Sequence, residues 1–526
     1  MIKDFSEFED QAVIAADVCI VGAGAAGITI AKEFIASRFT VVMLESGGLL
    51  PEADTQKLYE SEFVGLSHSF LPVARVRVFG GTTTLWGGQA LRFDDFDFLK
   101  RNWVPFSGWP FGREQLEPYY QRSAAVLQVR TPVSYGDLCA SFGVSSTQFD
   151  AAKLGMLCSQ WSPRPNFGAE YRQEIKESRN VTTVLHANVT GITTNRAATL
   201  VESIQFRTLA GKHGTAKARF YIICAGAIET ARLLLASDQI ESSGVGNKND
   251  LVGRFYQEHP MIWYGELRTA NRERMQDMFE SFYRHGLKYF PILSLSGNYQ
   301  QERQILNIQG SITFEDTPDS AITAMKTLYG AAITRKHPGP RELRRLIVNA
   351  LTDPAEFLRL TYRFGIQKRA GTPNRGPITF GGQCEMAPNP ESRVTLSQHR
   401  DQLGMRRVVL DWRLGELERR TASEFIQVIA SEFERLGLAT YDLAQASSLS
   451  GPNWTHMAHD SAHHMGTTRM HESAEFGVVD ANCQVHGIAN LYIGSSSVFP
   501  TSSRSNPTMT ILALCIRIAD HVKQLL

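Results

Sequence analysis

The chain has 526 residues, of which 43% are hydrophobic and 20% charged, and its formal net charge is +1 at pH 7. This length exceeds what one hydrophobic core usually supports, so we expect two intimately connected domains. The near-neutral composition is that of an ordinary globular protein and gives no indication of nucleic-acid binding.

The cysteines and the N-terminus indicate the cellular compartment. The seven cysteines are scattered and odd in number, which argues against a disulfide framework and favours a reducing environment. The first residues, MIKDFSEFEDQ, are acidic and lack a long apolar core, and no later run approaches the roughly 18 apolar residues of a membrane span. We therefore expect a cytoplasmic protein.

Residues 17–45 have the pattern of a strand, a glycine-rich turn, a helix and a second strand. The apolar runs 17–21 and 39–44 predict the strands, and residues 25–37 predict an amphipathic helix. The turn reads VGAGAAG, and the second strand ends in Glu45, 23 positions after Gly22. The pattern predicts a βαβ unit that binds a dinucleotide.

Each glycine of this turn has a separate expected purpose. Gly22 permits the tight turn, Gly24 lets the backbone approach a phosphate, and Gly27 lets the helix pack on the strand. The helix N-terminus supplies partial positive charge, and Glu45 can accept a hydrogen bond from a ribose hydroxyl. The alternative is a glycine-rich turn without a ligand.

Two further segments extend this unit. The loop VFGGTTTLWGGQ at 78–89 is too rich in Gly and Thr for a helix interior and could wrap a large planar cofactor. At 220–236 an apolar strand precedes the helix IETARLLLA, an order typical of a growing parallel sheet. The nucleotide-binding domain is therefore expected to be discontinuous.

From about residue 261 to 412 the chain has longer polar connections and aromatic strands, at 305–314 and 377–380, which is typical of a substrate domain. Residues 335–375 contain ten Lys or Arg against three acids. We favour a solvated helix face for this charge over a contact with a membrane surface or redox partner.

The C-terminal part places polar residues on separate turns. His463 and His464 open the run HHMGTTRM, and Asn506 and Pro507 precede a predicted helix at 508–526. Pro507 suits the first helical position, which puts Asn506 at the N-cap. Four histidines lie at 456, 459, 463 and 464, but no Cys or helical Glu completes a metal site, and we expect none.

Together these motifs resemble the glucose-methanol-choline oxidoreductases, flavoproteins that bind FAD and oxidise alcohols. The resemblance rests on VCIVGAGAAG with Glu45, FGGTTTLWGG, CAGAIETARLLLAS, LVGRFYQEHP around His259, and HHMGTTRM through SNPT. It covers essentially the whole chain and is greatest to sugar-oxidising members such as pyranose oxidases and fructose dehydrogenase catalytic subunits.

The resemblance implies an α/β fold with a Rossmann-type FAD-binding domain and an α+β substrate-binding domain that contains an antiparallel sheet. We assign 12–131, 177–260 and 452–526 to the first domain, and 132–176 and 261–451 to the second. His259 is expected to pack near the flavin domain as a structural histidine.

The resemblance also implies the residues that contact the cofactor. They come from the two glycine loops, the adenosine side and the C-terminal turn: Gly22, Gly24, Ala25, Ala26, Gly27, Glu45, Ser46, Gly80, Gly81, Thr82, Thr83, Leu85, Trp86, Gly87, Gly88, Val189, Ala225, Gly226, Ser496, Asn506, Pro507 and Thr508. Sugar oxidases with covalent flavin have a histidine before the loop tryptophan, whereas Leu85 precedes Trp86 here, so we expect non-covalent FAD.

The catalytic histidine of the family falls on His463 and its second active-site residue on Asn506, with His464 as a neighbouring rival. A neutral imidazole can take the proton of an alcohol while a hydride leaves carbon for flavin N5. Gln383 and Glu385 are candidates for substrate contact. The expected substrate is a sugar, glycoside or polyol, and the electron acceptor is oxygen, a quinone or a redox protein.

Two other functions stay open at this point. The same residues would serve a biosynthetic alcohol oxidase or dehydrogenase that acts on an aminoglycoside or other natural product. A non-catalytic flavin-binding or redox-sensing protein is the alternative from another class, and the presence of both His463 and Asn506 argues against it.

Overall fold

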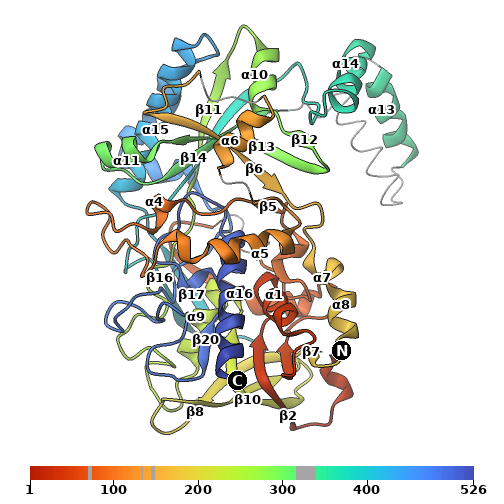
Figure 1. Cartoon of the computed structure of the whole chain (residues 1–526), viewed down its shortest axis with the longest axis vertical. Helices are drawn as coiled ribbons and strands as arrows, with labels where there is room; N and C mark the ends of the chain where they lie inside the picture. Colours follow the sequence, from red (N-terminus) through yellow and green to blue (C-terminus); the bar gives the residue numbers. More distant parts are fainter. Residues whose placement is uncertain (69–73, 132–133, 144–147, 316–338, 352) are drawn as a thin grey trace.

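The computed structural model describes residues 1–526 except 69–73, 132–133, 144–147, 316–338 and 352. Two large sheets lie one above the other along the long axis of the molecule, and both chain termini lie in the lower part (Figure 1). A pair of helices, α13 (Pro340–Leu351) and α14 (Pro354–Gly365), projects from one side of the upper part (Figure 1).

The lower sheet has the strand order β1-β7-β3-β2-β10-β9-β8, with β20 beside β10. Its strands are β1 (Ile2–Asp4), β2 (Ala12–Val21), β3 (Val41–Leu44), β7 (Val181–Leu185), β8 (Asn188–Thr194), β9 (Val201–Arg207), β10 (His213–Ile223) and β20 (Leu491–Ile493). The strands β1, β7, β3, β2, β10 and β20 pair in parallel. Alternation of strand and helix explains the parallel pairing, because each return needs a crossover.

The predicted βαβ unit is confirmed as β2, α1 (Ala25–Phe34) and β3. The helix ends three residues earlier than its apolar pattern suggests, and Ala36 beyond it has a φ of 61°. This left-handed residue turns the chain back toward the sheet, a change of direction that hydrophobic periodicity does not show.

The upper sheet is antiparallel, in the order β18-β11-β15-β14-β13-β6-β5 with β12 and β19 attached. Its strands are β5 (Gln89–Ala90), β6 (Leu154–Trp161), β11 (Met261–Arg268), β12 (Phe282–Arg284), β13 (Leu287–Leu295), β14 (Ile308–Phe314), β15 (Ile378–Cys384), β18 (Thr440–Tyr441) and β19 (Ala458–His459). The long helix α15 (Glu416–Arg435) packs on it through buried Phe425, Ile429 and Phe433.

A small third sheet joins β4 (Ser61–Gly65), β17 (Arg406–Trp412) and β16 (Arg393–Arg400). Val394, Leu410 and Trp412 of this sheet belong to the hydrophobic core of the lower part, whereas α15 belongs to the core of the upper part. The described side chains thus form two large cores, in agreement with the length of the chain.

The remaining helices surround these sheets. They are α2 (Ala53–Gln56), α4 (Asp95–Phe98), α5 (Glu117–Leu127), α6 (Tyr135–Ser141), α7 (Phe167–Glu170), α8 (Arg172–Glu177), α9 (Gly226–Ala236), α10 (Arg272–Phe279), α11 (Gly297–Arg303) and α16 (Thr508–Leu525), with short 3₁₀ turns between them. The C-terminal α16 is buried between α1 and α5, and the Tyr120 and Thr510 hydroxyls hydrogen-bond at 2.9 Å. None of the helices in the described part of the chain is long and apolar enough to cross a bilayer.

Cys139 of α6 and Cys158 of β6 form a disulfide. This pair corrects the sequence reading, in which the scattered cysteines argue against disulfides. The partners are 19 residues apart and have no characteristic spacing, so only the packing of α6 on β6 brings them together. The other five cysteines are free and buried.

Candidate active site

A cavity of about 1140 Å³ lies where the lower and upper sheets meet. The lower sheet contributes Gly22 and Glu45 to its wall, and the upper sheet contributes Met261, Trp263 and Gln383. The volume exceeds the range of roughly 300–1,000 Å³ that is usual for small-ligand pockets. It is therefore large enough for a dinucleotide and a small substrate together.

The glycine turn after β2 forms one end of this cavity. Gly22 has a φ of +100°, and a Cβ there would lie 2.7 Å from the carbonyl oxygen of Cys224. A Cβ on Gly27 would lie 1.9 Å from the Gly22 carbonyl, which confirms its predicted packing purpose. Gly24 precedes α1 without a side-chain cap, so the first backbone N–H groups of this helix are available to a phosphate.

Glu45 lies beside this turn and fixes its shape. Its buried carboxylate accepts hydrogen bonds from the backbone N–H of Ala23 at 2.8 Å and of Gly47 at 3.0 Å. Burial raises the pKa of Glu45, and these hydrogen bonds oppose the rise. Glu45 also lines the cavity, where a ribose hydroxyl can reach it.

The second glycine loop packs directly on the first. A Cβ on Gly81 would lie 2.8 Å from the Cα of Gly24, and a Cβ on Gly80 would lie 2.7 Å from Gly168. Both glycines have positive φ, +53° and +104°. Larger residues would separate the loops, so the two glycine runs together form one cradle that suits the pyrophosphate of a dinucleotide.

Nearly all residues predicted to contact the cofactor line this cavity. They are Gly22, Gly24, Ala25, Ala26, Glu45, Ser46, Gly81, Thr82, Thr83, Leu85, Trp86, Gly87, Gly88, Val189, Ala225, Gly226, Ser496, Asn506, Pro507 and Thr508. Gly27 and Gly80 do not line it, because both are used in backbone packing.

His463, His464, Gln383 and Asn506 meet in the same cavity from three separate segments. The position before the first residue of α16 is Pro507, and no side chain caps the helix. The expectation that Asn506 is the N-cap is therefore wrong by one residue. Since the helix does not use its side chain, the Asn506 amide is available to a ligand.

The protonation of His463 follows from its contact with His259. Nε2 of His259 lies 3.1 Å from the Ser502 carbonyl oxygen, which only accepts hydrogen bonds, so this nitrogen carries a proton. Burial lowers the pKa of His259 to about 4, so the ring is neutral and its Nδ1 is an acceptor. Nδ1 of His463 lies 3.0 Å from that Nδ1 and must be the donor. This leaves Nε2 of His463 as its unprotonated nitrogen.

A buried carboxylate organises the same histidine. Oε1 of Glu258 accepts hydrogen bonds from the backbone N–H of His463 at 2.7 Å, the N–H of His259 at 2.9 Å and the hydroxyl of Ser461 at 2.8 Å. Burial raises the pKa of Glu258 to about 7. Because Ser461 donates to Glu258, its oxygen is free to accept from Nδ1 of His463, 3.0 Å away.

The surroundings keep His463 neutral. Burial lowers the pKa of His463 well below its usual value, and the neighbouring His259 lowers it further. A neutral imidazole with a free Nε2 in a cavity can accept a proton from a bound hydroxyl group.

His464 has a different environment. Its ring stacks on Tyr256 with the centroids 6.2 Å apart. Its Nε2 lies 3.5 Å from Oε2 of Glu258, too far for good hydrogen-bond geometry, and has no hydrogen-bond partner in the described part of the chain. No contact therefore fixes the tautomer of His464 as His259 fixes that of His463.

Of the two candidates for substrate contact, the structure places only one in the cavity wall. Gln383 lines the cavity and donates a hydrogen bond to the Arg504 carbonyl at 2.6 Å. Glu385 does not line it: this fully buried carboxylate pairs with both terminal nitrogens of Arg101 and accepts the backbone N–H of Asn307 at 2.9 Å. The expectation that Glu385 faces the substrate is therefore corrected.

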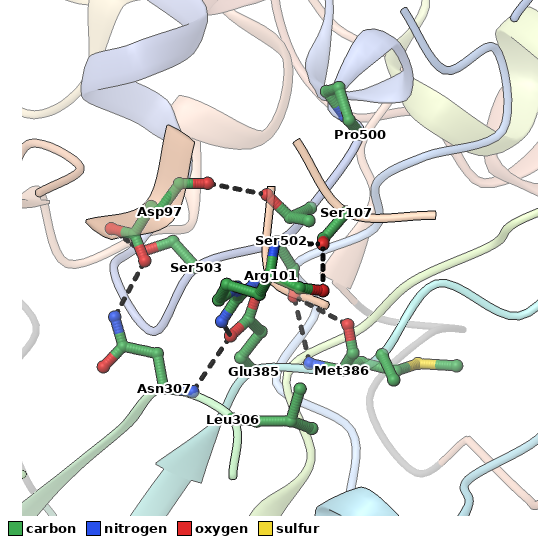
Figure 2. Close-up of polar contacts among 12 residues, drawn as sticks. Asp97, Arg101, Ser107, Leu306, Asn307, Glu385, Met386, Pro500, Ser502 and Ser503 are labelled. Carbon is green, nitrogen blue, oxygen red and sulfur yellow. Dashed lines mark hydrogen bonds and ion pairs between the residues drawn. The ribbon is translucent and has the colours of Figure 1, made fainter. Parts of the chain in front are cut away.

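Figure 2 shows that Glu385 belongs to a buried polar network that also contains Asp97, Asn307 and Ser503. Asp97 accepts from Asn307 at 2.7 Å and from the Ser503 hydroxyl at 2.8 Å. Ser502 accepts the backbone N–H of Met386 at 3.0 Å, while its carbonyl accepts from His259. The network joins the upper sheet to the turn that carries Asn506.

Sequence reasoning missed Glu258 and Ser461, the partners of His463. Glu258 directly precedes His259 in QEHP, and Ser461 lies two residues before His463 in DSAHH. The sequence gives only a weak indication of this contact, because Glu258 and His463 are 205 residues apart and meet only in the folded chain.

His459 lies on β19, where it pairs with Met261, and it lines the cavity.

Comparison with known proteins agrees with this architecture. Residues 388–515 match the family model described as GMC oxidoreductase. Full-length relatives include the fructose dehydrogenase large subunit of Gluconobacter japonicus, 23% identical with 97% of this chain and 98% of the relative covered. Another is 6'''-hydroxyparomomycin C oxidase of Streptomyces lividus, 26% identical with 96% and 92% covered.

Among solved structures, a formate oxidase variant of Aspergillus oryzae, studied for its effect on FAD modification, has the same fold. The TM-score is 0.59 at 16% identity, and 98% of this chain and 99% of that chain are covered. The family match at residues 388–515 and the full-length relatives make the chain similar to the glucose-methanol-choline (GMC) oxidoreductases, and the solved structure shares its fold. Together they indicate an oxidoreductase that acts on CH–OH donors.

Proposed function

We propose that the protein oxidises a CH–OH group of a sugar, glycoside or polyol to a carbonyl group with non-covalently bound FAD. The observation that carries this proposal is the hydrogen-bond chain from Ser502 through His259 to His463, which leaves an unprotonated nitrogen on a cavity-lining ring. The two glycine loops at the other end of that cavity support dinucleotide binding.

The residues of the cavity suit FAD. The turn Gly22–Gly24 and the N-terminus of α1 would hold the pyrophosphate, Glu45 a ribose, and the loop 81–88 together with Pro507 and Thr508 the flavin. When bound, FAD supplies the acceptor of the hydride at flavin N5. Leu85, at the position where a covalent attachment would need a histidine, supports non-covalent binding.

The chain's own residues handle the proton. Nε2 of His463 takes the proton of the substrate hydroxyl group as a hydride leaves the carbon that bears this hydroxyl. The resulting imidazolium keeps Nδ1–H on His259 and Ser461, and the Glu258 carboxylate behind Ser461 stabilises its charge. The Asn506 amide would donate to the substrate oxygen and hold it near Nε2.

The substrate class follows from the relatives and the cavity. The relatives named above are a fructose dehydrogenase subunit and an aminoglycoside oxidase. The wall of the cavity that contains His463 also carries Gln383, Gln89 and Asn506, which can hydrogen-bond hydroxyl groups. The aminoglycoside oxidase among the relatives makes an aminoglycoside or similar natural product the second candidate.

We further propose that residues 12–131, 177–260 and 452–526 form the FAD-binding domain and that 132–176 and 261–451 form the substrate-binding domain. The two cores support this division in outline. The exceptions include β16, β17, α7 and α8, which pack with the FAD-binding part, and Val104 and Trp454, which pack with the substrate-binding part. We also propose that the electron acceptor of the reaction is oxygen, a quinone or a redox protein.

An anaerobic substrate panel tests the proposed function. The flavin absorbance of the purified holoenzyme should bleach with at least one sugar, polyol or aminoglycoside and return when an acceptor is admitted. Peroxide release in air would identify an oxidase, and reoxidation only by quinone or dye a dehydrogenase. Failure of every alcohol to reduce the flavin would contradict the proposal and favour a non-catalytic flavoprotein.

A further inference from the structure

Helix α14 turns its polar side toward the protein. The Arg363 side chain is only 2% exposed, and its guanidinium pairs with Glu280 at 2.8 Å and Asp277 at 3.0 Å. Arg359 on the same side donates hydrogen bonds to the Thr372 carbonyl and to Gln276. Helix α14 therefore contacts the body of the protein through its charged face.

Several large apolar residues of α14, and Ile366 directly after it, face solvent, whereas Leu360 is buried. Leu358, Phe364 and Ile366 are 67%, 59% and 71% exposed, and Tyr362 is 54% exposed. A helix on the surface of a globular protein normally has the reverse orientation, with its apolar stripe toward the core. Exposed apolar clusters of this kind mark interaction sites.

The neighbouring helix α13 also exposes apolar residues and adds positive charge. Leu343, Ile347 and Val348 are exposed large hydrophobic residues of α13. Arg341, Arg344 and Arg345 are exposed as well, against one acid, Glu342, and none of the three forms an ion pair with a described residue. Figure 1 shows both helices projecting from the body on one side, where a flat surface can reach them.

We propose that α13 and α14 dock the protein on an anionic phospholipid surface. Leu343 and Ile347 are four residues apart, as are Arg341 and Arg345, so aliphatic side chains occupy one face of α13 and arginines an adjacent face. This is the arrangement of helices that lie in the interface plane, with apolar residues at the acyl boundary and arginines at the headgroups. Anionic headgroups complement the arginines, which no described acid neutralises.

Vesicle sedimentation tests the docking. The holoenzyme should sediment with vesicles of equal parts phosphatidylglycerol and phosphatidylcholine, much less with phosphatidylcholine alone, and less as salt is raised. The triple variant Arg341→Gln, Arg344→Gln, Arg345→Gln should weaken binding on the order of 100-fold, since each arginine near an anionic surface contributes roughly a fivefold factor. Leu358→Ser with Phe364→Ser should also weaken it.

Matched controls come from exposed residues elsewhere. Leu50 is 74% exposed and Arg196 is exposed on a distant turn, so Leu50→Ser with Arg196→Gln should bind vesicles like the wild type. Unchanged melting temperatures and substrate-driven flavin bleaching without vesicles would show that each variant is folded. Absence of vesicle binding, equal binding to both lipid mixtures, or a concentration-dependent dimer that the Leu358→Ser, Phe364→Ser variant abolishes would overturn the proposal.

Discussion

Nδ1 of His259 and Nδ1 of His463 lie 3.0 Å apart, and the other nitrogen of His259 is held by the Ser502 carbonyl. The Ser502 carbonyl fixes the proton of His259 on Nε2, and His259 in turn fixes the proton of the neighbouring His463 ring on Nδ1. His259, which the sequence presents as a structural histidine, is in our account a positioning residue for the base.

Replacement of His259 by Phe should slow the reaction without loss of the cofactor. Phe fills a similar space but cannot accept from Nδ1 of His463. Only Ser461 is then left to accept this proton, so the tautomer of His463 with a protonated Nε2 gains population. We expect kcat to fall by at least about 10-fold with little change in KM. Steady-state kinetics and flavin absorbance check this. An unchanged kcat, or an equal loss from KM alone, would contradict the positioning role.

The same substitution should change how stability depends on pH. Folded His259 has a pKa near 4, below its unfolded value of about 6.5. Between pH 6.5 and 4 the unfolded chain therefore binds more protons than the folded chain. The stability that neutral His259 contributes is complete above about pH 6.5 and is lost as the pH falls toward 4. At pH 5 the loss is about 2 kcal/mol.

Urea unfolding of wild type and His259→Phe at pH 8 and pH 5 measures this loss. The wild type should exceed the variant by more at pH 8 than at pH 5. Glu258 acts in the opposite direction, because its raised pKa favours the folded state as the pH falls from 7 to 4.5, but it is present in both proteins. A stability difference independent of pH would show that His259 is not buried in neutral form.

Glu385→Ala should destabilise the protein strongly. The substitution leaves Arg101, whose side chain is 1% exposed, without its partner. Breaking one side of a buried ion pair typically costs roughly 3–5 kcal/mol. Chemical denaturation measures the cost, and Glu416→Ala, which removes a surface pair with Arg419, is the control that should change stability by less than about 1 kcal/mol. Similar values for both would contradict the structural role of Glu385.

Asn506→Ala should reduce turnover more than stability, because the side chain does not cap α16. Loss of an N-cap would instead cost about 1 kcal/mol of stability. Turnover and melting temperature, measured on Asn506→Ala and Asn506→Asp, separate the two roles. A fall in melting temperature with normal turnover would restore the capping interpretation.

The local parts of this structure were the predictable ones. The turn from Gly22 to Gly27 and its βαβ unit follow from short-range steric rules, and the structure confirms them. The direction of the Glu385 side chain is harder to predict. Glu385 lies just past the end of β15 at Cys384, where the alternation of strand faces no longer applies. The pairing of Glu258 with His463 depends on β-sheet topology, which local patterns do not determine.

The most direct test of the account compares His463→Ala with His464→Ala in anaerobic single turnovers with a reducing substrate. Both rings line the cavity, but only His463 has its proton placed by His259. General-base catalysis contributes about 10² to 10⁴ in rate, so His463→Ala should bleach its bound flavin slower by that factor, and His464→Ala by far less. A large loss in His464→Ala with near-normal bleaching in His463→Ala would contradict the account.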